Sequence, residues 1–231
     1  MGRTVLGIVL VAAVTGGAAI AAEPAQLAWA AYAAGVPSPK AATGVAPGER
    51  PLRPEEISSY FSALAAASPR AKRIEYARSR EGRPLFVLAV SDEGTIARLD
   101  AFRAEHVKRM DPRGRRPEDD AKATESAKAV AWMAYGIHGD ELSSGDAAAA
   151  LAYWLVAGED DRAKALRRDL VVLIDPAENP DGRARFLSMT AWFAHTAPSP
   201  DGQDVSHTAA WPWGRGNHYL YDLNRDWFTM V

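Results

Sequence analysis

Apolar residues occur along this chain in two patterns, short uninterrupted runs and longer stretches of helical spacing. The uninterrupted runs predict buried strands at residues 85–90, 129–135 and 170–174. Helical spacing predicts helices at residues 54–67, 96–110, 143–156 and 161–168, with a helical turn at 183–190. A weaker alternation at 73–77 is compatible with a further strand. Strands that alternate with helices and are apolar along their length indicate an α/β fold, with a mostly parallel or mixed sheet flanked by helices.

The N-terminus has the features of a secretory signal peptide. Arg3 precedes an uncharged, mostly apolar stretch at residues 5–22, and small residues crowd its end just before Glu23. We therefore expect residues 1–22 to be removed, the mature protein to be secreted or periplasmic, and no stable membrane insertion after cleavage. An uncleaved membrane anchor is the alternative, because the stretch is long enough to be one.

The remaining chain divides at residue 53. Residues 23–53 are rich in Ala, Pro and Gly without a sustained amphipathic period, so they predict a linker or N-terminal arm. Residues 54–231 then form one domain. Within it, the charged segment 111–128 predicts an exposed loop, and the segment 191–221, rich in aromatic residues, Gly and Pro, predicts an ordered loop.

Composition narrows the possible chemistry. The 231 residues include 27 Lys and Arg against 29 Asp and Glu, for a net charge of −2. Proteins that bind nucleic acid usually show a strong basic excess, so we expect no nucleic-acid partner. The absence of cysteine excludes disulfides, thiolate metal ligands and a cysteine nucleophile. A bound metal would therefore need His, Asp or Glu ligands.

Three polar clusters follow apolar segments, where open α/β sheets place their functional sites. They are His138 to Glu141, Asn179 to Gly182, and Asp222 to Asp226. His138 and Glu141 are three residues apart on a strand-to-helix turn, so both side chains can face one metal ion. The same pair is also compatible with an ordinary helix start, in which Glu141 is favoured by the helix dipole.

The second cluster has a simple structural interpretation, and the third has both a structural and a functional one. Residues 179–182, Asn-Pro-Asp-Gly, have the composition of a β-turn. Asn224 beside Arg225 can hold a substrate carboxylate through an amide and a two-pronged guanidinium. Arg225 can instead form a surface ion pair with Asp222 or Asp226.

In combination, the clusters resemble the zinc carboxypeptidase family (M14, carboxypeptidase A-like). The similar segments, in family order, are Ser-Arg-Glu-Gly-Arg-Pro-Leu at 79–85, Tyr-Gly-Ile-His-Gly-Asp-Glu at 135–141, Asn-Pro-Asp-Gly at 179–182 and Asp-Leu-Asn-Arg at 222–225. The resemblance implies a zinc ion held by His138 and Glu141.

The resemblance also implies a substrate and its anchors. Asn224 and Arg225 would bind the free C-terminus of a peptide or protein substrate. An arginine that stabilises the transition state would follow the 179–182 loop, and Arg185 is the candidate for it.

The resemblance covers about residues 54–231 and only the N-terminal part of the family domain. The family's third zinc ligand, a His, and its general-base Glu follow the Asn-Arg pair, and neither residue type occurs after Arg225. A catalytic zinc site uses three protein ligands and an open position for water. We therefore expect a truncated carboxypeptidase domain, incomplete at its C-terminus, that is weakly active or inactive.

Two other functions remain open at this point. A deacylase of the aspartoacylase or succinylglutamate-desuccinylase type also uses a His-x-x-Glu pair and an Asn-Arg pair. A non-catalytic fragment that binds a peptide carboxylate or a metal is the third possibility. The Asn-Pro-Asp-Gly loop and the signal peptide favour the peptidase. The leading hypothesis is a zinc-dependent metallocarboxypeptidase that removes C-terminal residues from peptides outside the cytoplasm.

Overall fold

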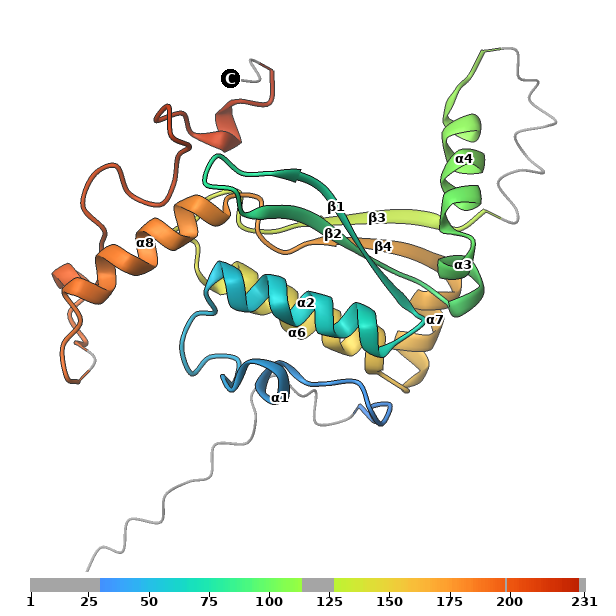
Figure 1. The fold of residues 1–231 in the computed structure, drawn as a ribbon, viewed down its shortest axis with the longest axis horizontal. Coiled ribbons are helices and arrows are strands. Elements are labelled where there is room, and N and C mark those ends of the chain that lie inside the picture. Colours follow the sequence, from blue (N-terminus) through green and yellow to red (C-terminus); the bar gives the residue numbers. More distant parts are fainter. Residues whose placement is uncertain (1–29, 114–126, 198, 229–231) are drawn as a thin grey trace, which may run out of the picture.

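The computed structural model describes residues 30–113, 127–197 and 199–228. In this part of the chain four strands form one sheet in the order β1-β2-β4-β3 (Figure 1). The strands are β1 (Ala71–Arg78), β2 (Pro84–Val90), β3 (Ala129–Ala134) and β4 (Leu170–Asp175). β2 is antiparallel to both β1 and β4, and β3 is parallel to β4, with Ala129 opposite Leu170 and Ala134 opposite Asp175. The sheet is therefore mixed, which confirms the α/β class predicted from the sequence.

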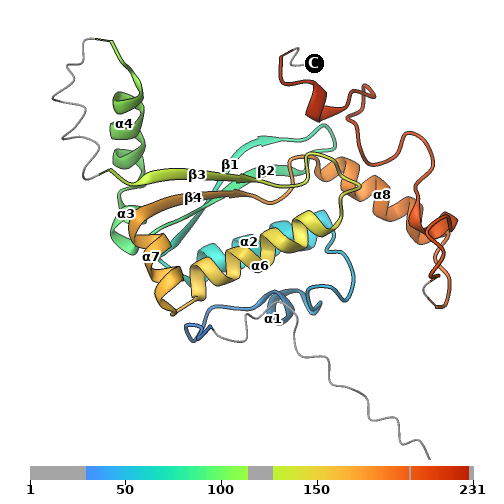
Figure 2. The same ribbon diagram turned by 180° about the vertical axis from the view of Figure 1, so that it is seen from behind.

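Helices cover the sheet unevenly. The helices are α1 (Pro39–Thr43), α2 (Pro54–Ala67), α3 (Glu93–Ala97), α4 (Leu99–Met110), α6 (Ser143–Ala157), α7 (Asp161–Asp169) and α8 (Pro180–Trp192). Figures 1 and 2 show α2 and α6 side by side on one face of the sheet, whereas α3 and α4 lie at one end of it. α8 starts beyond the carboxyl end of β4 and runs away from the sheet.

Local signals explain where the main helices begin and end. Pro54 occupies the first turn of α2, where its missing N–H costs nothing, and Glu56 accepts a hydrogen bond from the Arg53 backbone N–H (2.8 Å). Asp160 caps α7 by accepting from Ala163 N (3.0 Å). The predicted helix at 96–110 is divided in the structure, because the backbone of Arg98 leaves the helical conformation between α3 and α4.

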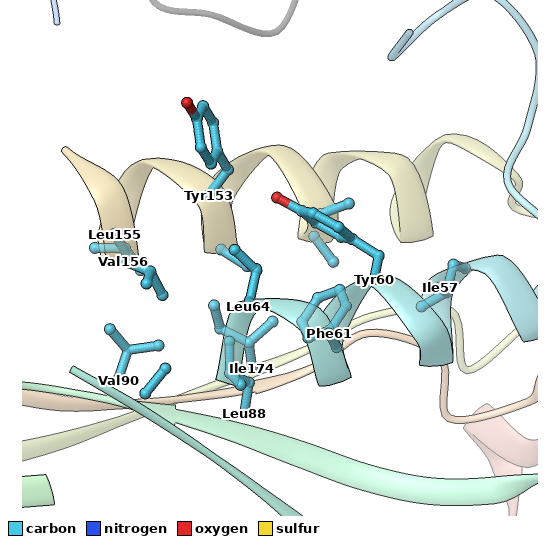
Figure 3. Packing of buried hydrophobic residues seen from close by; sticks show 14 of the residues in the cluster. Ile57, Tyr60, Phe61, Leu64, Leu88, Val90, Tyr153, Leu155, Val156 and Ile174 are labelled. Carbon is cyan, nitrogen blue, oxygen red and sulfur yellow. The ribbon is translucent and has the colours of Figure 1, made fainter. Parts of the chain in front are cut away.

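The main core lies between the sheet and the α2–α6 pair (Figure 3). Large side chains of α2 point down onto apolar residues of β2 and β4, and α6 closes the layer. The residues with 2% exposure or less in this layer include Ile57, Tyr60, Phe61, Leu64, Leu88, Val90, Leu155, Val156 and Ile174. α6 faces this core largely with alanines, and such small side chains let the two helices approach closely. The core therefore supports β4, after which the 179–182 cluster begins. β3, which precedes the 138–141 cluster, lies at the edge of the sheet and is largely exposed, so the prediction of a buried strand there was wrong.

The segment before α2 is docked on the helical layer within the described range. The Tyr32 ring stacks on Tyr153 of α6, with ring centroids 4.6 Å apart. Leu52 is 2% exposed, and Val45 is also buried. Residues 30–53 thus contribute to the core as an N-terminal arm.

Two regions singled out in the sequence fall wholly or largely outside the described residues. These are the signal peptide expected at 1–22 and most of the loop expected at 111–128. None of the helices in the described ranges combines the length and the apolar character needed to cross a membrane.

Candidate functional site

Three loops converge beyond the carboxyl ends of β3 and β4, and their backbones are in direct contact. Gly139, in the loop after β3, donates its N–H to the carbonyl of Gly214 (2.9 Å). A Cβ atom on Gly139 would overlap the backbone at 182–183, at only 2.7 Å from Gly182 Cα. No side chain fits at this crossing, so glycine is required by the close approach rather than by an unusual backbone conformation.

Asn179 holds two of these loops together. Its side-chain oxygen accepts from Gly182 N (2.9 Å) and so caps α8, in which Pro180 is the first residue. Its amide nitrogen donates to the carbonyls of Arg215 and Gly216, at 3.2 Å each. The segment 179–182 is therefore a helix start and not the isolated β-turn that its composition also allowed.

His138 lies between two carboxylates. The imidazole is 4% exposed. Its Nδ1 atom is 2.8 Å from Glu141 Oε1, and its Nε2 atom is 2.9 Å from Asp222 Oδ1. The Glu141 side chain is 55% exposed, so one side of the pair is open to solvent while the imidazole is enclosed.

Asp222 connects His138 to the Asn-Arg pair. It precedes the short 3-10 helix η2 (Leu223–Arg225) and accepts from Asn224 N (2.9 Å) through the same oxygen that faces His138. Its other oxygen accepts from Arg215 Nε (2.9 Å). Desolvation raises the pKa of Asp222, but the hydrogen bonds from His138 and Arg215 outweigh it and bring the pKa down to about 2. Asp222 is therefore a carboxylate at neutral pH.

Arg215 is the arginine that lies against His138, and no motif in the sequence points to it. Its Nη1 atom is 3.2 Å from His138 Nδ1, while its Nε atom is held by Asp222. The one local signal for it is its position between two glycines, Gly214 and Gly216, in a segment without regular periodicity. The contact joins residues 77 positions apart and depends on the fold of that segment.

The other predicted residues lie around this centre. Asn224 accepts a hydrogen bond from Trp227 Nε1 (3.1 Å) through its side-chain oxygen. Arg225 is exposed and donates to the Asn224 carbonyl (3.1 Å). Asp222 pairs with Arg215 instead of Arg225, so the Asn-Arg pair is linked to His138 through the Asp222 carboxylate.

Arg185 lies on α8 and supports the loop that carries Arg215. It donates to the carbonyls of Trp213 (2.6 Å) and Gly216 (3.0 Å), one on each side of Arg215. Both acceptors are backbone carbonyls, so the guanidinium of Arg185 holds the loop. Its proposed role, stabilisation of the transition state, stays a prediction from the sequence.

The donor set around His138 suits a zinc ion. Nδ1 and the Glu141 carboxylate are the nitrogen and oxygen ligands that zinc takes in the absence of cysteine. Metal-bound histidines commonly donate their second ring nitrogen to a carboxylate, which is the position of Asp222 at Nε2. Arg215 lies next to Nδ1, so a bound ion would share this space with its guanidinium.

A second group of possible ligands lies at the β1–β2 turn. Glu81, Asp181 and His218 form the one such group of three in the described ranges. Arg83 bonds to both carboxylates, at 2.8 Å from Asp181 Oδ1, and Ser79 donates to the same Asp181 oxygen (2.7 Å). This group is an ion-pair network that attaches the loop carrying His218 to the hairpin.

Comparisons with known proteins agree with these motifs. A family model described as zinc carboxypeptidase matches residues 57–230. No curated protein matches the sequence.

Solved structures similar to this chain include carboxypeptidase A from Helicoverpa armigera, with 17% identity, a TM-score of 0.42, and coverage of 77% of this chain and 42% of that one. Thrombin activatable fibrinolysis inhibitor is 16% identical, with a TM-score of 0.41, and the match covers 78% of this chain and 44% of that one. The bovine form of that inhibitor, solved in complex with tick carboxypeptidase inhibitor, is 15% identical with a TM-score of 0.39. This match covers 78% of this chain and 56% of that one. The chain thus spans about half the length of the solved structures that it matches.

Replacing Gly139 with Ala should destabilise the protein and displace the loop that carries His138. The added methyl group would meet backbone atoms, which cannot move aside as a flexible side chain can. We expect a loss of about 1–3 kcal/mol in the free energy of unfolding, as for other overpacked sites, measured by urea denaturation. Gly202→Ala is the matched control, because a Cβ there meets nothing within 4 Å. Equal stability of the two variants would contradict the close-contact interpretation.

Glu178 should make the protein less stable as the pH rises. Its pKa is raised from 4.5 to about 7, because burial and the nearby Asp175 charge disfavour the ionised form. Between these two values the folded state keeps a proton that the unfolded state has released, so the free energy of unfolding falls with increasing pH. Glu178→Gln should remove this decline between pH 5 and pH 8, measured by urea denaturation at both values.

Glu56→Gln is the control for that pH dependence, with the opposite sign of shift. The hydrogen bond from Arg50 outweighs desolvation and lowers the Glu56 pKa to about 2, so its stabilising contribution is complete throughout pH 5–8. This variant should lose the same free energy at both pH values. A Glu178→Gln variant whose stability declines as steeply as that of the wild type would refute the assignment.

Proposed function

The chain belongs to the zinc carboxypeptidase family, and on that premise we propose that it supplies the metal-binding turn and the carboxylate anchor of a metallocarboxypeptidase. The activity would be hydrolysis of the last peptide bond of a peptide or protein with a free C-terminus. The observation that supports it best is the buried His138 imidazole, held between Glu141 and Asp222.

His138 and Glu141 would hold the zinc ion. When Nε2 donates its proton to Asp222, the Nδ1 lone pair is free for a metal and the ring cannot turn away. The bound zinc would supply Lewis-acid polarisation of the scissile carbonyl and a water molecule of lowered pKa. Asp222, an anion at neutral pH, makes the imidazole a stronger ligand.

Arg215 would stabilise negative charge that develops on the substrate. Its Nε atom is held by Asp222, which would keep the guanidinium beside the metal position, while its Nη1 atom would give up the contact with Nδ1 to a bound ion and become available to the substrate. Preorganised donors of this kind contribute strongly to acyl-transfer reactions. We assign this role to Arg215 in preference to Arg185, whose donors are directed to backbone carbonyls.

Asn224 and Arg225 would recognise the substrate's terminal carboxylate. Within the described residues the one hydrogen bond of the Arg225 guanidinium goes to the Asn224 carbonyl, which leaves further donors for a ligand. A planar guanidinium can bind a carboxylate through two parallel hydrogen bonds. This would restrict the enzyme to substrates with a free C-terminus, as expected of an exopeptidase.

Residues 1–22 would export the protein to the periplasm or the extracellular medium, as their sequence pattern indicates. N-terminal sequencing of exported protein should begin at Ala22 or Glu23. Membrane-bound protein that retains Met1 would indicate an anchor instead.

Zinc binding tests the metal site directly. The described residues offer two ligands at this position, whereas a catalytic site uses three, so the affinity of the purified chain should be modest. His138→Ala should weaken it by more than about ten-fold, because even the loss of an outer partner of a ligand costs about that much and here a direct ligand is lost. The measurement is competition against a chromophoric chelator. His195→Ala is the control, because that imidazole is exposed and, among the described residues, bonds to Asp204 alone.

If His138→Ala binds zinc as the wild type does, the metal lies elsewhere and the proposed site is wrong. The group at the β1–β2 turn is the next position to test, through His218→Ala.

Arg225→Ala should remove the preference for a free carboxylate. We expect the wild type to bind an N-acetylated peptide with a free C-terminus about five-fold more tightly than its C-terminal amide, which corresponds to about 1 kcal/mol for an exposed charge-assisted pair. The variant should bind both equally, as measured by NMR titration. Arg168→Ala, at an exposed arginine paired with Asp169 on α7, should keep the preference. A wild type that does not distinguish the two peptides would rule out the anchor.

A further inference from the structure

Arg183 is a buried guanidinium that the proposed chemistry does not use. It lies in the first turn of α8 and its side chain is 3% exposed. Its three nitrogens donate to three different positions: Nε to the Leu52 carbonyl (2.8 Å), Nη1 to the Leu142 carbonyl (2.7 Å) and Nη2 to Asp146 Oδ2 (2.9 Å). Asp146 in turn accepts from Leu52 N (3.1 Å). One side chain thus joins the N-terminal arm, the start of α6 and α8.

We propose that Arg183 is the positioning residue for Glu141, because it fixes the turn between His138 and α6 from both ends. The proposal rests on the proposed metal site. At one end, the Arg183 backbone packs against Gly139, next to His138. At the other end, its guanidinium holds the carbonyl of Leu142, next to Glu141.

The turn needs this external support. The structure shows no side-chain cap on the backbone N–H groups at the start of α6, where the N-cap residue is Leu142. The Glu141 side chain is half exposed, so little packing restrains it directly. Apart from its contact with the imidazole (2.8 Å), its position relative to His138 therefore depends on the backbone on each side of it, which is what Arg183 holds.

The Arg183 guanidinium packs closely against the first turn of α6. A Cβ on Gly145 would lie 3.2 Å from Arg183 Cζ and 2.9 Å from the Ile57 side chain, so only glycine leaves room in the first turn of α6. Burial lowers the pKa of Arg183 and Asp146 opposes that effect. A buried charge is costly unless all its bonds are kept, so the bonds to Leu142 and Asp146 should hold tightly.

Hydrogen exchange of the metal-free protein is the first test. Arg183→Lys keeps the charge but cannot reach three acceptors at once. We expect amide exchange at residues 139–146 to become at least ten-fold faster. Asp146→Asn, which removes the charged acceptor and nearly preserves the shape, should have the same effect if the lysine variant does not fold.

Arg167→Lys is the matched control. Arg167 is 5% exposed and donates to the Leu155 carbonyl, toward the other end of α6. It should increase exchange near residue 155 and leave 139–146 unchanged. Unchanged exchange at 139–146 in both the Arg183 and Asp146 variants would overturn the proposal.

Zinc affinity is the second test and separates the proposal from the function on which it rests. If His138 binds zinc, Arg183→Lys should weaken binding about ten-fold, as for residues that orient metal ligands, and Arg167→Lys should not. Wild-type affinity in Arg183→Lys would overturn the positioning role while leaving the metal site intact. If the wild-type chain binds no zinc at His138, the proposed metal site is wrong. The positioning role is then wrong too, even if hydrogen exchange at residues 139–146 is faster in the Arg183 variant.

Discussion

The geometry of the candidate site depends on the contact of three backbones at Gly139, Gly182 and Gly214. At this point the loops after β3 and β4 and the segment after α8 approach more closely than any side chain permits. Backbone contacts of this kind cannot be relieved by a change of rotamer, so they restrict the relative position of the loops. Each loop then contributes one part of the site: the imidazole from the first, the cap of α8 from the second, and the Arg215–Asp222 pair from the third.

Carboxylates and nitrogen-bearing side chains alternate along the site. The order Glu141, His138, Asp222, Arg215 places each polar group beside a complementary one, which makes the burial of the imidazole tolerable. His138 is buried and Asp222 and Arg215 are partly exposed, whereas Glu141 and Arg225 are open to solvent. A rigid interior with an accessible rim suits a site that must hold ligands in a defined geometry and still admit a large substrate.

Much of this arrangement could be predicted from the sequence, because it follows from local patterns. The three apolar runs became β2, β3 and β4, and the polar clusters at 138–141 and 179–182 lie at carboxyl ends as expected. The third cluster, at 222–226, was expected there too, but within the described residues it follows an irregular segment and not a strand. The partners of His138 could not be predicted, because Arg215 and Asp222 are 77 and 84 positions away in a segment without periodicity. The apolar runs predicted a mostly parallel or mixed sheet, and the structure has one parallel pair, β3–β4, and two antiparallel pairs, because the apolar sequence of a strand does not by itself specify its direction.

The docking of the N-terminal arm has a consequence for the order in which the molecule folds. The carbonyl of Leu52 finds its donor in Arg183, 131 residues later in the chain. During synthesis, the arm therefore emerges long before Arg183 exists, and its direct bond to Asp146 of α6 gains the support of the Arg183 guanidinium only after α8 has been made. Contacts of such high sequence separation carry a large loop-closure cost and form late. The helical layer can assemble first, whereas the turn that bears His138 and Glu141 acquires its final geometry only when the chain closes this long loop.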